Sequence, residues 1–145
     1  MEESGGIQRG LPLTEAETRL FPAEMVAPKL GIGMMSPERV VLFQLSVKCC
    51  PHLETQNKCG IYLNRPLMCR SFPIVAGAIS NRCKMFSYRK PGVTYQEPFT
   101  MTQQFEESER LEKHIEKQVL KHCKSGYRFW EFDLKTKKWV DKGSL

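Results

Sequence analysis

Three cysteines, three prolines and two arginines share one short stretch of this chain, and they constrain its fold more than any other feature. The stretch is CPHLETQNKCGIYLNRPLMCRSFP, from Cys50 to Pro73. A further thiol follows at Cys83, so roughly a quarter of the chain supplies four soft ligands. Four such ligands are what a tetrahedral zinc site or an iron–sulfur cluster requires. The stretch therefore predicts a metal-binding cysteine scaffold with irregular backbone.

The cysteines are predicted to be reduced thiols. The chain opens with MEESGG, which has neither the positive charges nor the apolar stretch of a secretory signal, so we expect a cytoplasmic protein. Clustered thiols in a reducing compartment are more often metal ligands or catalytic groups than disulfides. Two alternatives stay open, because cysteines can also be buried as small apolar side chains or form disulfide staples.

Length, composition and charge limit the fold class. With 145 residues, 41% of them hydrophobic, and with 9 Pro and 10 Gly, the chain predicts one small, irregular α+β domain over residues 1–145. A cysteine-cluster core is expected at about 40–90, and a helix and hairpin extension at about 98–141. No run of about 18 apolar residues occurs, so no membrane span is predicted. The basic residues behind the net charge of +6 are scattered, which favours a solvated surface over a nucleic-acid-binding stripe.

The first third of the chain predicts one short helix, a loop and a strand. Thr14 and Glu17 have the spacing of a capping box, so a helix should begin at Thr14 and end before Pro22. Residues 27–35, APKLGIGMM, contain a proline and two glycines and predict a loop. The β-branched and partly alternating residues that follow predict a strand from Val40 to Val47.

The last third of the chain predicts a long helix and a hairpin. Gln103 to Lys124 contains no Gly or Pro and places apolar residues four apart along one face, as an amphipathic helix does. Gly126 should end that helix in the left-handed conformation. Residues 127–140 alternate large and polar side chains around a Lys-Thr-Lys turn, which predicts a hairpin with Trp130 and Trp139 paired across it. We expect these aromatic residues to have a structural role.

Four short motifs in the cysteine stretch match the signature of a known family. They are Cys50-Pro51-His52-Leu53, Cys59-Gly60-Ile61-Tyr62, Arg65-Pro66 and Cys69-Arg70-Ser71-Phe72-Pro73, followed by Cys83. Upstream, residues 13–17 match the leucine-threonine-glutamate helix start of the same family. On these motifs the chain resembles the YkgJ-like cysteine-cluster family. The resemblance implies a domain that chelates zinc or iron.

The resemblance and the clustering of the thiols together predict four metal ligands, which are Cys50, Cys59, Cys69 and Cys83. Members of the family usually carry a CxxCxxCC block near the N-terminus, whereas this chain has no cysteine before Cys49. Cys49, Cys123 and His52 therefore stay open as replacement ligands.

The spacing of the thiols bears on the choice of cofactor. Eight residues separate Cys50 from Cys59 and nine separate Cys59 from Cys69, so no pair forms the CxxC knuckle typical of zinc ribbons. Widely spaced ligands favour a [4Fe–4S] cluster over zinc, without deciding between them. Thiolate ligation leaves negative charge, and Arg65 and Arg70 are predicted to contact the cofactor and balance that charge.

Common catalytic motifs do not occur in the sequence. There is no Gly-rich phosphate loop and no HExxH motif, and the three histidines have no spacing that suggests a catalytic pair. The glutamates at 106, 107 and 109 are expected to be solvated at the start of the long helix, where negative charge suits the helix dipole. The sequence therefore leaves open whether the protein is an enzyme.

Three functions remain compatible with these features. The first is a cytoplasmic metal-binding protein with a redox, sensing or metal-handling role exerted through a protein partner. The second is a cluster-dependent protein-modifying enzyme, because some relatives in the family are flagellin lysine-N-methylases. The third is a nucleic-acid-binding module with structural zinc, in which Lys135, Lys137, Lys138 and the aromatic hairpin would form the contact surface. We expect the first.

Overall fold

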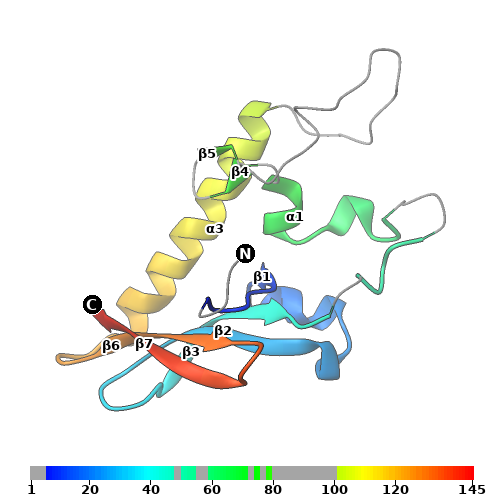
Figure 1. The fold of residues 1–145 in the computed structure, drawn as a ribbon. Helices are drawn as coiled ribbons and strands as arrows, with labels where there is room; N and C mark the ends of the chain where they lie inside the picture. Colours follow the sequence, from blue (N-terminus) through cyan, green and yellow to red (C-terminus); the bar gives the residue numbers. More distant parts are fainter. Residues whose placement is uncertain (1–5, 48–49, 55–58, 72–73, 76–77, 80–100) are drawn as a thin grey trace.

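A five-stranded antiparallel sheet is the largest element of the structure (Figure 1). The computed structural model describes residues 6–47, 50–54, 59–71, 74–75, 78–79 and 101–145. The strand order is β1-β3-β2-β6-β7. The bounds are β1 Leu11–Leu13, β2 Val26–Gly33, β3 Arg39–Leu45, β6 Arg128–Asp133 and β7 Lys138–Ser144. With the long helix α3, Met101–His122, this sheet confirms the predicted α+β class.

The central strand β2 corrects the prediction of a loop at 27–35. It pairs with β3 on one side and with β6 on the other. The presence of Gly31 and Pro28 in this strand is explained by how the strand packs and pairs. A Cβ atom at Gly31 would lie 3.2 Å from the ring of Trp139, so glycine allows this ring to pack closely against the strand. The register shifts between Pro28 and Leu30, where the proline has no N–H to donate to a ladder.

The capping box is formed as predicted, although the turn that follows it is a 3-10 helix. Thr14 N donates to Glu17 Oε1 at 3.0 Å, and Glu17 N donates to Thr14 Oγ1 at 3.3 Å. The turn η1 spans Ala16–Leu20 and ends at the extended Phe21. A second 3-10 turn, η2 Ala23–Met25, leads into β2. The short helix predicted to begin at Thr14 and end before Pro22 is thus present as this 3-10 turn.

The predicted long helix and hairpin are both present. α3 is close to the predicted bounds, and Gly126 follows it with a φ of +85°. The hairpin joins β6 to β7, but the cross-strand tryptophan pair is wrong. From the turn, Asp133 pairs with Lys138, and in this register Trp130 lies opposite Asp141. Trp139 instead lies opposite Phe132 and meets it edge-on, with ring centroids 5.3 Å apart. The hairpin aromatic side chains thus have the expected structural role.

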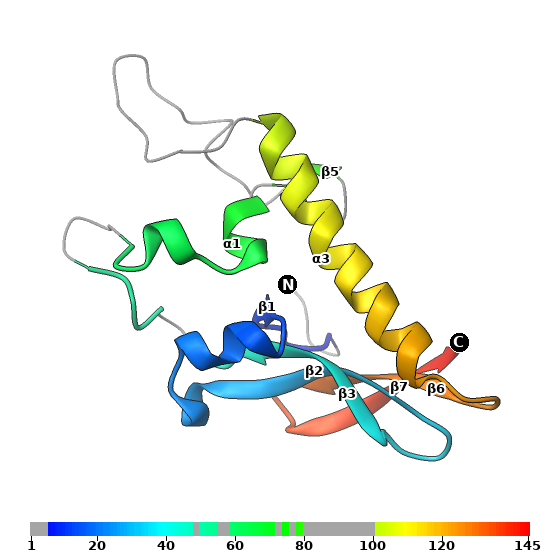
Figure 2. The same ribbon diagram turned by 180° about the vertical axis from the view of Figure 1, so that it is seen from behind.

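Two apolar clusters hold the sheet together. One contains the buried residues Leu13, Phe21 and Leu45, where η1 covers the end of the sheet that includes β1. The other contains Ile32, Val41 and Tyr127, against which Val119 of α3 packs. The strand prediction of Val40–Val47 is confirmed by β3, which contributes to both clusters. α3 contacts the sheet near its C-terminal end and extends away from it (Figures 1 and 2).

Buried polar groups in the sheet have partners from distant segments. The fully buried Gln44 accepts a hydrogen bond from Gly10 N at 2.7 Å and donates to the carbonyl of Pro28 at 2.8 Å. The buried carboxylate of Glu131 accepts a bond from Arg9 Nε at 2.6 Å and lies 3.5 Å from Lys29 Nζ. These pairs attach the N-terminal segment to the middle of the sheet.

The region between β3 and α3 has only short elements in its described parts. They are η4 Tyr62–Asn64, α1 Leu67–Ser71, β4 Ile74–Val75 and β5 Ala78–Ile79. This agrees with the expected irregular cysteine-rich region. α1 packs beside the N-terminal half of α3 (Figure 2). No helix in the described ranges is long and apolar enough to cross a membrane.

Candidate metal centre

Residues 50–71, here called the cysteine segment, hold three of the four predicted ligands. Cys69 lies in α1, whose first intrahelical bond runs from Arg70 N to the carbonyl of Pro66 at 3.0 Å. Pro66 is fully buried. Because proline has no backbone N–H, this residue leaves no unpaired donor just before the helix. The carboxylate of Glu17 accepts the N–H of Leu67 at 2.8 Å. The start of the helix that contains Cys69 is thereby bonded to η1.

Cys50 and Cys59 lie at the two ends of one loop. Leu53 N donates to the carbonyl of Cys50 at 3.1 Å, and Gly60 N donates to the carbonyl of His52 at 2.7 Å. Leu53 and Cys59 form an isolated antiparallel bridge. The loop is therefore closed by backbone bonds next to both thiols.

His52 attaches this loop to η1. Its Nε2 donates to the carbonyl of Leu20 at 2.5 Å, and its ring packs against Phe21 with centroids 5.1 Å apart. This contact occupies Nε2 and gives His52 an anchoring role, while a ligand role of His52 through Nδ1 stays a prediction. Both thiol-bearing parts of the cysteine segment are thus bonded to the same 3-10 turn, shown in blue between the sheet and the green segment in Figure 2.

The three thiols are electrostatic neighbours. Burial raises the pKa of Cys69 to about 11, and the thiolate charges of Cys50 and Cys59 raise it as well, while the positive charge of Arg65 opposes them. Cys50 is exposed, and Cys59 and Cys69 are half-buried. The cysteines that the structure describes form no disulfide, which leaves their sulfurs available as soft donors.

The structure leaves the complete ligand set a prediction. Within the described ranges, no group of three or more Cys, His, Asp or Glu side chains is arranged to hold a metal ion. Cys83 and the alternative Cys49 lie outside the described residues. Cys123 is a poor replacement, because α3 separates it from Glu107, which contacts α1, by about 24 Å at 1.5 Å per residue.

The two predicted cofactor-binding arginines have different surroundings. Arg65 is the cation whose charge reaches Cys69. Arg70 Nη2 lies 3.3 Å from Glu107 Oε2, so this arginine joins α1 to α3. The Nε of Arg70 is buried and has no hydrogen-bond partner among the described residues. Binding of the cofactor by these two residues stays a prediction.

Glu107 corrects the expectation that the acidic start of the long helix is solvated. Its side chain is 8% exposed, and its two oxygens lie 3.3 Å from Arg70 and from Arg110. The adjacent Glu106 and the next glutamate, Glu109, are exposed as expected. The burial of Glu107 follows from the packing of α1 on α3, which local helix patterning does not reveal.

Sequence reasoning also missed that Glu17 and His52 anchor the cysteine segment. The only available signal was the capping box, which predicted a hydrogen bond from Glu17 to its own turn. The second bond of Glu17 joins residues 50 positions apart. No spacing rule predicts contacts of that kind.

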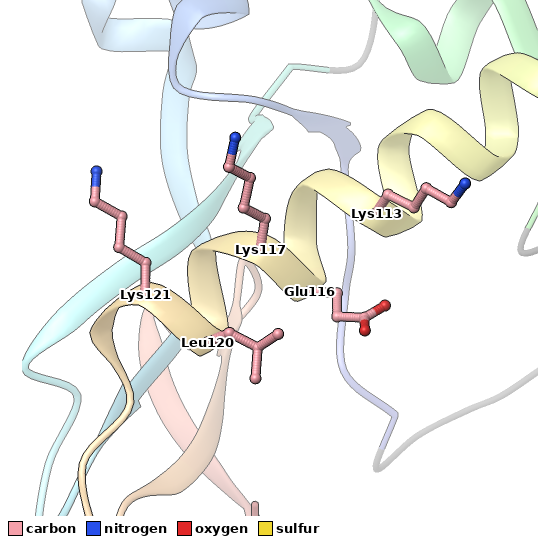
Figure 3. A pocket seen from close by; sticks show the side chains of 5 residues that line it. All are labelled: Lys113, Glu116, Lys117, Leu120 and Lys121. Carbon is pink, nitrogen blue, oxygen red and sulfur yellow. The ribbon is translucent and has the colours of Figure 1, made fainter.

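A charged hollow on α3 lies apart from the thiols. It has a volume of about 570 Å³, and Figure 3 shows its lining side chains, which are Lys113, Glu116, Lys117, Leu120 and Lys121. The three lysine side chains extend away from the helix, and Lys113 pairs with the exposed Glu109 at 3.0 Å. This lining contains no thiol or imidazole, and its mixed charges are typical of a solvated helix surface.

The structure defines a small, cysteine-rich α+β domain whose described thiols at Cys50, Cys59 and Cys69 lie on segments bonded to η1. A family model described as "Putative zinc- or iron-chelating domain", CxxCxxCC, matches residues 12–124. The match covers more than three quarters of the chain and includes all six cysteines. The protein belongs to this family, which confirms the resemblance inferred from the cysteine motifs. No curated protein and no solved structure matches the chain.

Proposed function

We propose that this protein binds a thiolate-ligated metal centre, a [4Fe–4S] cluster or zinc, through Cys50, Cys59, Cys69 and Cys83. One observation carries the proposal. Two separate parts of the chain, the loop with Cys50 and Cys59 and the helix with Cys69, are hydrogen-bonded to the same turn η1, and their thiols interact electrostatically. Family membership supports the same chemistry.

The donor chemistry fits a soft or borderline metal cation. Burial and the neighbouring thiolates oppose ionisation of Cys69 in the metal-free protein. A bound cation would offset that repulsion, because it stabilises each thiolate that coordinates it. When bound, a cluster would supply electron transfer, whereas zinc would supply structural cross-linking or exchangeable metal. Arg65 would balance part of the remaining negative charge.

We also propose a redox, sensing or metal-handling role in the cytoplasm, exerted through a protein partner. The lining of the α3 hollow, which consists of three lysines, one glutamate and one leucine, contains no thiol or imidazole. The hairpin tryptophan Trp139 packs against Gly31 and Phe132, so it contributes to the fold where the nucleic-acid alternative would need a free stacking surface. Cluster-dependent protein modification is the alternative function, and binding of adenosylmethionine would support it.

The first experiment is to measure iron, zinc and acid-labile sulfide per chain in protein purified without oxygen. About four iron and four sulfide establish a cubane cluster, and one zinc without sulfide establishes a zinc site. Cys69→Ser should lose the metal, and Cys123→Ser should keep it, because Cys123 lies at the far end of α3. A metal-free wild-type protein that takes up neither metal on reconstitution would contradict the proposal. With a cluster present, binding of adenosylmethionine distinguishes the enzyme from the redox or sensing protein.

A further inference from the structure

Glu17 uses both carboxylate oxygens to join two distant parts of the chain. Oε1 accepts the N–H of Thr14 at 3.0 Å, and Oε2 accepts the N–H of Leu67 at 2.8 Å. The first bond lies within the capping box of η1, and the second reaches the first residue of α1. A carboxylate with two backbone N–H partners has little freedom to rotate, because each oxygen is held separately.

The bond to Leu67 replaces a cap that the local sequence cannot provide. The N–H groups in the first turn of a helix have no intrahelical partner, and a side chain just before the helix usually accepts one of them. In α1 that position is Pro66, whose carbonyl accepts the bond from Arg70 but whose side chain has no acceptor. Glu17, which lies 50 residues upstream, therefore caps the N-terminus of α1, the short helix that contains Cys69.

The other end of this contact is fixed by the sheet. Leu13 is fully buried, pairs with Phe43 of β3 and precedes Thr14, which is also buried. Phe21, at the end of η1, is part of the same apolar cluster as Leu13. η1 is thus held at both ends, and Glu17 projects from a rigid support to α1.

The loop with the other two thiols uses the same support. His52 bonds to the carbonyl of Leu20 and packs on Phe21, at the end of η1 opposite to the capping box. These two contacts to a single turn link α1, and with it Cys69, to the loop that contains Cys50 and Cys59, while α1 also packs on α3 through Arg70 and Glu107.

We infer that Glu17 is a positioning residue of the metal site, which holds the start of α1, and with it Cys69, near the loop that contains Cys50 and Cys59. This inference rests on the proposed metal-binding function. Glu17 itself is not a ligand, since both of its oxygens already accept backbone hydrogen bonds. Residues that orient metal ligands through hydrogen bonds commonly change metal affinity by 10- to 100-fold when they are replaced.

The test is a titration of the apoprotein with Co²⁺, whose visible and sulfur charge-transfer bands report the number and geometry of thiolate ligands. Glu17→Gln retains the shape of the side chain but has one acceptor oxygen for two N–H donors. We expect its affinity for Co²⁺ to fall about 10- to 100-fold, with altered visible bands. Glu15→Gln is the matched control, because Glu15 is exposed, lies in the same turn and loses the same charge.

A second variant removes the same hydrogen bond from the other side. Leu67→Pro deletes the donor N–H and leaves the charge of Glu17 unchanged, and proline is well tolerated at the first position of a helix. Like Glu17→Gln, it should lower the affinity for Co²⁺ and alter the visible bands. If Glu17→Gln does not fold, Leu67→Pro is the variant that tests the inference. Folding of each variant is checked by circular dichroism.

The possible outcomes distinguish the proposed metal-binding function from the positioning role of Glu17. A wild-type protein that binds neither Co²⁺, zinc nor iron would contradict the proposed function and the role of Glu17 together. Wild-type binding with unchanged affinity and spectrum in Glu17→Gln, or in Leu67→Pro where that variant carries the test, would overturn the positioning role and leave the metal function standing. Equal losses in Glu15→Gln and Glu17→Gln would assign the effect to charge and would also overturn it.

Discussion

The sheet and the cysteine segment are stabilised in different ways. The sheet has strands of up to eight residues and buries Leu13, Ile32 and Leu42 almost completely. In the described parts of the cysteine segment the longest helix has five residues, and Leu53 and Leu63 are 51% and 82% exposed. Apolar burial is the dominant favourable term in folding, so the sheet has its own driving force and the cysteine segment has little.

This difference shows which part of the protein should depend on metal. Short elements held by a few hydrogen bonds lose much conformational entropy when they are ordered, and a metal bound by distant residues offsets that loss. We expect metal removal to loosen the cysteine segment and leave the sheet intact.

Replacement of a ligand should have the largest effect, confined to the cysteine segment. Cys69→Ser and Cys59→Ser should each abolish stoichiometric metal binding, because serine is a poor ligand for the soft metals that thiolates bind. Metal analysis measures the loss, and urea unfolding followed by tryptophan fluorescence should show an almost unchanged sheet. Unchanged metal content in either variant would contradict the ligand assignment.

Loss of the buried carboxylate of Glu131 should damage the sheet and spare the metal. Glu131→Ala leaves Lys29, whose side chain is 11% exposed, without its nearby counter-charge and also removes the bond to Arg9. We expect the free energy of unfolding to fall by on the order of 3 kcal/mol, measured by urea denaturation. Asp141→Ala is the control, since its ion pair with Arg128 is exposed on both sides and should contribute at most about 1 kcal/mol. Equal effects of the two changes would contradict the account of the sheet.

Metal affinity should rise with pH. Because burial raises the pKa of Cys69 to about 11, this thiol is protonated in the metal-free protein at neutral pH. Metal must displace that proton, so affinity should increase at least about tenfold per pH unit between about pH 6 and 8. Competition titrations with a chelator of known proton affinity measure the slope. An affinity independent of pH would show that the Cys69 thiol is not a ligand.

The contact between α1 and α3 should have the smallest effect. Arg70→Ala removes the partner of the buried Glu107 and should lower local stability by on the order of 1 kcal/mol. Hydrogen exchange at the amides of α1 measures this, while exchange in the sheet should not change. Arg110→Ala is the control, because the Arg110 side chain is 65% exposed and should contribute less than about 0.5 kcal/mol. Faster exchange throughout the sheet in Arg70→Ala would show that the two regions are more closely coupled than we propose.

Local sequence signals predicted the elements whose causes are local. The capping box of Thr14 and Glu17, α3 and the β6–β7 hairpin all depend on residues a few positions apart. The central strand β2 was mistaken for a loop because its proline and glycines are usually loop signals. Here glycine at position 31 allows the close approach of the ring of Trp139, which is more than 100 residues away. The predicted Trp130–Trp139 pair is wrong because the position of the turn sets the register of a hairpin, and the pairing of Asp133 with Lys138 places Trp139 opposite Phe132.

The candidate site shows the same limit. The cysteines and their family were evident from the sequence, because thiols with neighbouring prolines form a recognisable pattern. The anchors were not evident. The bonds from Leu67 to Glu17 and from His52 to Leu20, and the pairing of Arg70 with Glu107, each join residues more than 30 positions apart. Their existence depends on how the cysteine segment packs against η1 and α3.

X-ray absorption spectroscopy at the metal edge of the loaded protein measures directly whether sulfur atoms bind the metal. We expect a first shell of sulfur atoms, at about 2.3 Å for zinc, and for a cluster an additional iron–iron scattering shell. Cys69→Ser should lose this sulfur shell, whereas Cys123→Ser should keep it. A first shell of nitrogen and oxygen atoms alone would contradict thiolate ligation and with it the proposed function.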